Sequence, residues 1–145
     1  MRLLIALALA IAAVSMTSAQ SSSKQIVTTG GNPSLPFSPA VKAGGLIYVA
    51  GTLGTNAAGA IAKGDIKAQT KQTLDNIAAT LKAGGSSIAN ATSVTVYLRN
   101  AGDFAAMNEV YATFFTGAAP PARTTVQATL PNEAALVEID VVALQ

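Results

Sequence analysis

The chain has 145 residues, of which 50% are hydrophobic and only 11% are charged. It contains no cysteine and no histidine, which excludes disulfides, thiol nucleophiles, thiolate metal sites and imidazole acid–base or metal chemistry. With a formal net charge of +2 and 5% aromatic residues, it shows no basic stripe of the kind that binds nucleic acid. The seven acidic residues are scattered along the sequence, so we expect no metal site.

The first segment has the three parts of a secretory signal peptide. A positive start at Arg2 precedes an unbroken apolar run over residues 3–14, which is too short to span a bilayer. Thr17-Ser18-Ala19 then forms a small-residue cleavage site. We predict a signal peptide over residues 1–19, cleaved before Gln20, and a periplasmic or secreted protein. An N-terminal anchor that is never cut is the alternative.

The mature chain, residues 20–145, has the length of one domain, and ordered structure is expected from about residue 24. Alternation, capping and turn residues predict strands, a helix, a strand, a helix and strands, in that order. The expected strands cover residues 24–28, 40–43, 46–51, 92–98, 123–130 and 136–144, and the expected helices cover residues 65–83 and 103–115. This is an α+β arrangement.

Turn and capping residues mark where these elements begin and end. Gly44-Gly45 predicts a hairpin between two strands, and Gly84-Gly85 ends the first helix. Asp65 and Asp103 are expected N-caps of the two helices. The apolar side of the second helix is expected to consist of Phe104, Met107, Tyr111, Phe114 and Phe115.

The last expected strand carries two acids in an apolar sequence. Alternation sends Val137, Ile139 and Val141 to one face, which we expect against the two helices. Glu138 and Asp140 then lie on the other face. Burying such charges alone is costly, so they need a partner, a cleft or a subunit interface. Because two helices cover only one face of a sheet, the second face predicts oligomerisation through sheet-to-sheet contact.

Arg123 begins the preceding strand and shares a face with Thr125 and Gln127. A guanidinium offers a fork of donors that matches a carboxylate with two prongs. If the last two strands pair, Arg123 and Glu138 lie close together. The spacing allows both a structural Arg–Glu salt bridge and a site that binds a small carboxylate.

Several segments, in order and spacing, resemble the RidA (YjgF) family. Residues 120–126, Pro120-Pro121-Ala122-Arg123-Thr124-Thr125-Val126, and residues 136–140, Leu-Val-Glu-Ile-Asp, resemble its C-terminal signature. Similar stretches cover the early loop at 36–40, the strand at 47–51 and the two helices at 69–77 and 103–115. The resemblance extends over nearly all of residues 24–144.

This resemblance implies a chorismate-mutase-like α+β fold with one mixed sheet and two helices packed on one face. It implies a homotrimer with three clefts between subunits, a small-molecule substrate, no nucleic acid and no stable membrane anchor. Family members that carry the arginine hydrolyse enamines and imines, such as 2-aminoacrylate and 2-iminopropionate, to 2-oxo acids and ammonia without a cofactor. Most of the family is cytosolic, which is the alternative location.

By position, the resemblance assigns a role to each site residue. Arg123 would grip the substrate carboxylate, and Glu138 would hold or activate the attacking water. Gly51 would let the backbone approach the ligand, and Asn108 would support the cleft. The main chain at Thr125 would contact the imine nitrogen.

Two positions depart from the family pattern. Phe37 stands where the early loop often has a tyrosine, and we expect it as an apolar wall of the cleft. Thr125 stands where a cysteine is frequent, which removes an oxidation site and leaves backbone contacts unchanged.

Two other function classes compete with the deaminase. A non-catalytic binding protein would hold small carboxylates or protect other proteins, and export favours it because most pyridoxal-phosphate enzymes that release enamines are cytoplasmic. A ribonuclease or translation inhibitor, a role attached to relatives, has no support in a near-neutral chain without histidine.

Overall fold

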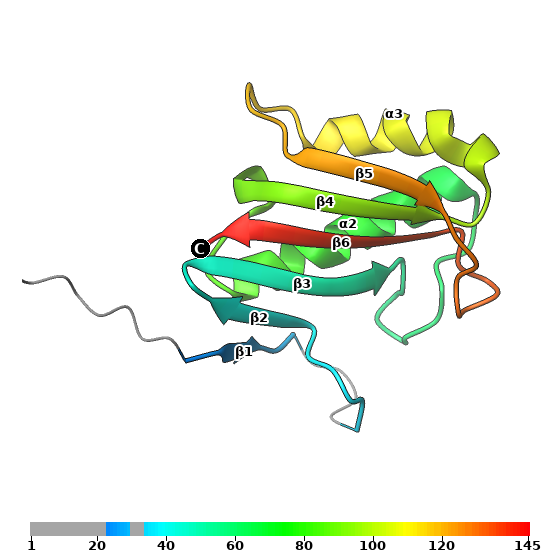
Figure 1. Cartoon of the computed structure of the whole chain (residues 1–145). Helices are drawn as coiled ribbons and strands as arrows, with labels where there is room; N and C mark the ends of the chain where they lie inside the picture. Colours follow the sequence, from blue (N-terminus) through cyan, green and yellow to red (C-terminus); the bar gives the residue numbers. More distant parts are fainter. Residues whose placement is uncertain (1–22, 30–33) are drawn as a thin grey trace, which may run out of the picture.

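The computed structural model describes residues 23–29 and 34–145. Over these residues a mixed sheet of six strands carries two helices on one face (Figure 1). The strands are β1 (Gln25–Val27), β2 (Ala40–Ala43), β3 (Leu46–Leu53), β4 (Ala91–Leu98), β5 (Ala122–Gln127) and β6 (Val137–Leu144). The helices are α2 (Ile66–Ala83) and α3 (Phe104–Phe114), with short 3₁₀ helices η1 (Ile88–Asn90) and η2 (Ala101–Asp103). The expected fold is confirmed.

The predicted signal peptide, residues 1–19, lies outside the described residues, as do residues 30–33 of the early loop. Within the part that the structure describes, no helix has the length and apolar character needed to cross a membrane.

The strand order is β1-β2-β3-β6-β4-β5, and only the β4–β5 pair is parallel. The predicted hairpin is present, because Gly44 and Gly45 both take positive φ, at 59° and 79°, between β2 and β3. The last two strands do not pair, since β4 lies between β5 and β6. The chain from β4 to β5 passes through α3, and such a crossover returns the next strand parallel to the first.

Local signals define α2 as expected. The Asp65 carboxylate accepts a hydrogen bond from the Ala68 backbone N–H at 3.0 Å, and Gly85, with φ of 83°, follows the helix end. Helix α3 differs, because Asp103 makes no side-chain cap hydrogen bond. Asn100 instead caps η2, where its side chain accepts from the Gly102 backbone N–H at 2.9 Å.

The core lies between the sheet and the two helices. Val137, Ile139 and Val141 of β6 are completely buried there, which confirms the alternation expected for this strand. They pack in one cluster with Leu74, Ile77 and Leu81 of α2 and Val94, Val96, Leu98 and Met107 of β4 and α3. Phe104 is not part of this core, since its side chain at the start of α3 is 44% exposed.

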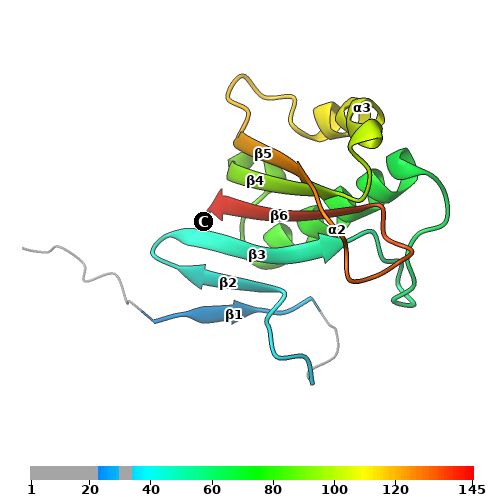
Figure 2. The same ribbon diagram turned by 45° about the vertical axis from the view of Figure 1, so that its right-hand side comes forward.

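Among residues 23–29 and 34–145, no helix lies over the opposite face of the sheet (Figures 1 and 2). An apolar row crosses four neighbouring strands on this open face, because Ile26, Val41, Tyr48 and Val142 are successive cross-strand partners. Ile26 and Tyr48 are 59% and 45% exposed. The open face therefore presents apolar surface as well as the acids of β6.

Candidate active site

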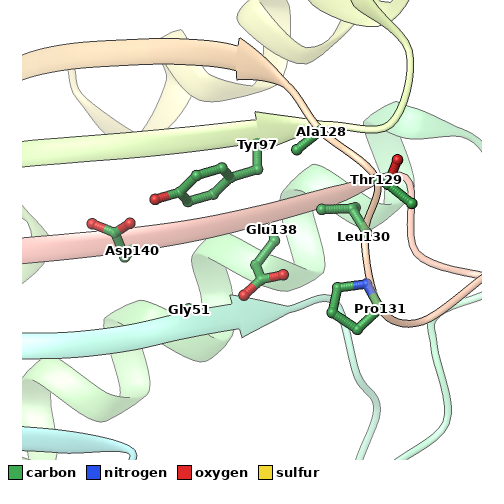
Figure 3. A pocket seen from close by; sticks show the side chains of 8 residues that line it. All are labelled: Gly51, Tyr97, Ala128, Thr129, Leu130, Pro131, Glu138 and Asp140. Carbon is green, nitrogen blue, oxygen red and sulfur yellow. The ribbon is translucent and has the colours of Figure 1, made fainter.

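A cavity of about 280 Å³ opens on the uncovered face at the N-terminal end of β6 (Figure 3). Its lining is formed by Gly51, Tyr97, Ala128, Thr129, Leu130, Pro131, Glu138 and Asp140. The cavity is just below the usual range for small-molecule sites, about 300–1,000 Å³, which fits a compact substrate. Two predicted site residues, Gly51 and Glu138, thus lie together.

Gly51 leaves the space that the Glu138 carboxylate occupies. The β3–β6 register shifts between Val49 and Thr52, so β3 bulges at this point. A Cβ atom added to Gly51 would lie 2.1 Å from Glu138 Oε1. The family resemblance implies that Gly51 lets the backbone approach the ligand, and the structure places the Glu138 carboxylate of the same chain beside this glycine.

Tyr97 is a residue of this cavity that sequence reasoning did not select. It is the direct β4 partner of Glu138 in the β4–β6 ladder, and Asp140 lies two residues farther along the same face. Burial raises the pKa of Tyr97, and the negative charge of Asp140 raises it further. The alternation of residues 92–98, which places Tyr97 on the face opposite Val94 and Val96, was the signal that could have identified it.

The loop between β5 and β6 forms the other wall of the cavity, and two side chains hold it. Arg99, just after β4, donates from Nε to the Ala135 carbonyl and from Nη2 to the Asn132 carbonyl, both at 2.6 Å. Gln69 of α2 is buried, donates to the Ala134 carbonyl at 3.0 Å and accepts from the Leu136 N–H at 2.8 Å. No local sequence signal predicts these contacts, which join residues 33 to 67 positions apart.

Arg123 lies on the other face of the sheet. In the parallel β4–β5 ladder it is the partner of Val94, whose side chain faces the helices. Its guanidinium carbon is 4.4 Å from the centroid of the Tyr111 ring and 5.7 Å from that of Phe104, both on α3. The condition for bringing Arg123 close to Glu138 within one chain, pairing of the last two strands, is therefore not met: β4 separates them and their side chains point to opposite faces.

Unpaired polar atoms surround Arg123. Thr125 Oγ1 and the Tyr111 hydroxyl are both buried and have no hydrogen-bond partner among the described residues. Burial raises the pKa of Tyr111, while Arg123 opposes that shift. Asn108 is half-buried on α3, three and four residues from Tyr111 and Phe104, and so shares their side of the helix. Buried polar atoms normally have a hydrogen-bond partner, which protein, water or a ligand can supply.

Phe37 joins neither group of residues. Its ring is 59% exposed in the segment before β2 and does not line the cavity of Glu138. The end of that segment is tethered beside Gly51, because the Ala50 N–H donates to the Pro39 carbonyl at 3.0 Å.

Comparison with known proteins gives the family. A family model described as Endoribonuclease L-PSP matches residues 14–145. The chain belongs to the RidA (YjgF) family. A RutC family protein of Pyrococcus horikoshii is 43% identical over 123 residues, which make up 83% of this chain and 97% of that protein.

Solved RidA-family structures share the fold. RidA from an Antarctic Psychrobacter species is 32% identical, with a TM-score of 0.76, over 83% of this chain and 99% of its own. TdcF from E. coli, in a structure with bound serine, is 29% identical, also with a TM-score of 0.76, over 83% of this chain and 98% of its own. Family membership supports a general role of the imine or enamine deaminase type.

Within residues 23–29 and 34–145, no group of three or more Asp, Glu, His or Cys side chains is arranged to hold a metal ion. The groups available for chemistry in the cavity are two carboxylates, a phenol, the Thr129 hydroxyl and backbone.

Proposed function

We propose that the protein hydrolyses 2-imino and 2-enamine acids of the 2-iminopropionate and 2-aminoacrylate type to 2-oxo acids and ammonia, in a site that two copies of the chain complete. The observation that carries this proposal is the position of the two key side chains. Arg123 and Glu138 lie on opposite faces of one sheet. A single substrate therefore reaches both only where one protomer presents Arg123 to the open face of another.

The surface of the chain supports such an assembly. The apolar row of Ile26, Val41, Tyr48 and Val142 crosses the open face, and exposed apolar patches of this kind are typical of protein interfaces. Arg123 belongs to β5, the edge strand, from which its side chain can enter a cleft beside a neighbouring sheet. We propose the homotrimer with three clefts that the family resemblance implies.

Each half of the proposed site has a distinct task. Arg123 of one protomer binds the substrate carboxylate with its two-pronged guanidinium, while the Thr125 main chain contacts the imine nitrogen and Asn108 supports this wall. Glu138 of the other protomer directs a water molecule to the imine carbon. Addition of water across C=N gives a carbinolamine, and its collapse releases ammonia and the 2-oxo acid. An imine carbon is already electrophilic, so positioning and one carboxylate base suffice.

The bound ligand of a relative is consistent with this chemistry. TdcF from E. coli holds serine, a small molecule with one carboxylate and one nitrogen on the neighbouring carbon. 2-Iminopropionate has the same two groups in the same relation, and the cavity of about 280 Å³ has room for a molecule of that size.

Mixing two inactive variants tests the shared site. We expect Arg123→Ala and Glu138→Gln each to remove activity while the chain stays folded and trimeric. Refolding the two variants together in equal amounts should restore about a quarter of the wild-type sites, the fraction that combine an intact Arg123 with an intact Glu138 across an interface. Activity is followed as loss of 2-iminopropionate, generated by an amino-acid oxidase and trapped with semicarbazide.

The chain carrying both substitutions, refolded in the same way, is the matched control and should stay inactive. No recovered activity in the mixture would refute a site shared between copies. A wild-type chain that binds pyruvate by calorimetry but leaves imine loss unaccelerated would instead support a non-catalytic binding protein.

The ribonuclease description of the family receives no support from the site geometry. Within one chain, Glu138 and Asp140 line the cavity with no basic side chain, and the proposed assembly adds a single guanidinium, that of Arg123, which is too little positive charge to hold an RNA backbone. We expect no product in an RNA-cleavage assay with the wild-type chain.

We also propose that residues 1–19 direct export to the periplasm or to the outside of the cell. Mass spectrometry of the protein from its host should then find a chain that begins at Gln20; an intact N-terminus on cytosolic protein would contradict export.

A further inference from the structure

The chain has three tyrosines, and each has a different setting. Tyr48 lies in the apolar row of the open face, 45% exposed and outside the cavity of Glu138. Tyr111 packs under the Arg123 guanidinium on the helix side. Tyr97 is the one tyrosine that lines the cavity of Glu138.

The geometry gives the Tyr97 hydroxyl a fixed direction. Tyr97 and Glu138 are cross-strand partners, so their side chains leave the sheet next to each other on the open face. The ring lies along the sheet with its hydroxyl toward Asp140, while the Glu138 carboxylate turns toward Gly51 (Figure 3). Tyr97 and Glu138 thus approach the same cavity from neighbouring strands, with different partners of their own.

Asp140 determines whether the Tyr97 hydroxyl donates or accepts a hydrogen bond in the cavity. The carboxylate raises the pKa of Tyr97, after burial, through its negative charge and as an acceptor for the hydroxyl, so the phenol keeps its proton at neutral pH. When the hydroxyl hydrogen is directed to Asp140, the phenol oxygen keeps two lone pairs; the Thr95 hydroxyl, whose hydrogen bond lowers the pKa of Tyr97, uses one, and the other remains as an acceptor. An N–H donor in the cavity can use it.

We propose that Tyr97 is a substrate-contacting residue whose oxygen accepts an N–H of the protonated imine, while Glu138 directs water to the adjacent carbon. This inference rests on the proposed function. A protonated imine has two N–H groups, one for the Thr125 main chain of the neighbouring protomer and one for Tyr97. The reaction balances as iminium acid plus water giving 2-oxo acid plus ammonium, with the proton of the attacking water passing through Glu138 to the departing nitrogen.

The same contact makes Tyr97 a specificity residue. A 2-oxo acid product has an oxygen where the substrate has its nitrogen, so it offers no N–H to the phenol oxygen. The chain that supplies Tyr97 adds two carboxylates to this part of the cavity, while Arg123 of the other protomer is taken up by the substrate carboxylate, so the negative charge favours a positively charged nitrogen over a carbonyl. Product should leave the site more readily than substrate.

Tyr97→Phe tests the contact, with Tyr48→Phe as its matched control on the same face. We expect Tyr97→Phe to lower kcat/KM for 2-iminopropionate about tenfold to a hundredfold, the effect of losing one hydrogen bond to a charged group. Binding of pyruvate, measured by calorimetry, should change less than about twofold, because pyruvate lacks the N–H. Tyr48→Phe should match the wild type in both measurements.

A binding measurement keeps this inference separate from the proposed function. L-Alanine, the amino counterpart of pyruvate, carries N–H donors whether or not the protein catalyses hydrolysis. Tyr97→Phe should weaken L-alanine binding and leave pyruvate binding unchanged. Equal losses for both ligands would mean a merely structural role. Wild-type values of kcat/KM and of L-alanine affinity in Tyr97→Phe would also overturn the inference.

Asp140→Asn extends the test to the partner of Tyr97. It should reduce L-alanine binding in the wild-type chain and reduce it much less in the Tyr97→Phe chain, because the effect of Asp140 passes in part through the phenol. Fully additive losses would show that Asp140 acts independently of Tyr97.

Discussion

Gly51→Ala is the sharpest single perturbation of the cavity. The added Cβ would lie 2.1 Å from Glu138 Oε1 and 3.1 Å from its Cδ, whereas ordinary contacts begin near 3.4 Å. The carboxylate oxygen must therefore retreat by about 1 Å or more, and a misplacement of that size costs about a hundredfold in rate. That factor corresponds to about 2.7 kcal/mol of lost transition-state stabilisation.

The same substitution should cost little stability. Gly51 does not have the positive φ that would strain an alanine, and the atom in its way is the flexible end of a side chain. Moving that end off its preferred rotamer costs about 1 kcal/mol. The effect on activity should therefore exceed the effect on folding, and Gly51→Ala should be folded, trimeric and nearly inactive.

Gly54→Ala is the matched control three residues away. Its Cβ would lie 2.7 Å from the Gln69 backbone carbonyl oxygen, which cannot rotate aside. Overpacking of this kind costs about 1–3 kcal/mol, so Gly54→Ala should lower the urea midpoint and keep the activity of each folded molecule. The semicarbazide assay and urea unfolding on both variants separate the two effects. Wild-type activity in Gly51→Ala would refute the role given to the Glu138 carboxylate in this position.

Two further predictions concern the surroundings of the site. Arg99→Lys cannot reproduce the two guanidinium hydrogen bonds to the Ala135 and Asn132 carbonyls. It should therefore raise the rate of amide hydrogen exchange in the loop over residues 128–136 and lower kcat about tenfold. Unchanged hydrogen exchange in this loop would contradict the role of Arg99. Folding raises the pKa of Tyr111 above its ordinary 10.0. The contribution of the protonated phenol to the free energy of unfolding is therefore complete below pH 10 and is lost as the pH rises above that value. Tyr111→Phe should therefore show a smaller fall in urea midpoint between about pH 8 and about pH 10.5 than the wild type, and an equal fall would contradict this account.

Structural features that depend on residues close together in the sequence were predicted well. Asp65, Gly44-Gly45 and the alternation of residues 136–144 each act within a few positions, and the structure has the cap, the hairpin and the buried face that they indicate. The open face with Glu138 and Asp140 followed from the same alternation, since two helices cover only one side of the sheet.

Structural features that depend on contacts between distant parts of the chain were missed. The position of β4 between β5 and β6 follows from the crossover through α3, which the local pattern of residues 123–144 does not contain. For that reason the sequence left open whether Arg123 and Glu138 lie close together in one chain. The bulge that joins Gly51 to Glu138, the phenol of Tyr97 in the cavity and the contacts of Gln69 to the loop all join residues far apart in sequence.

The division of Arg123 and Glu138 between two faces has a consequence for how the protein behaves on dilution. Under the shared-site proposal, a separated protomer keeps its fold and loses every site, so specific activity should fall with protein concentration once that concentration drops below the dissociation constant of the assembly. Under the proposed export, the protein would be diluted outside the cytoplasm. Affinity between protomers is then a requirement of catalysis itself, and charged substitutions in the apolar row of the open face would act as catalytic defects without touching a substrate, whereas Tyr48→Phe keeps the apolar surface.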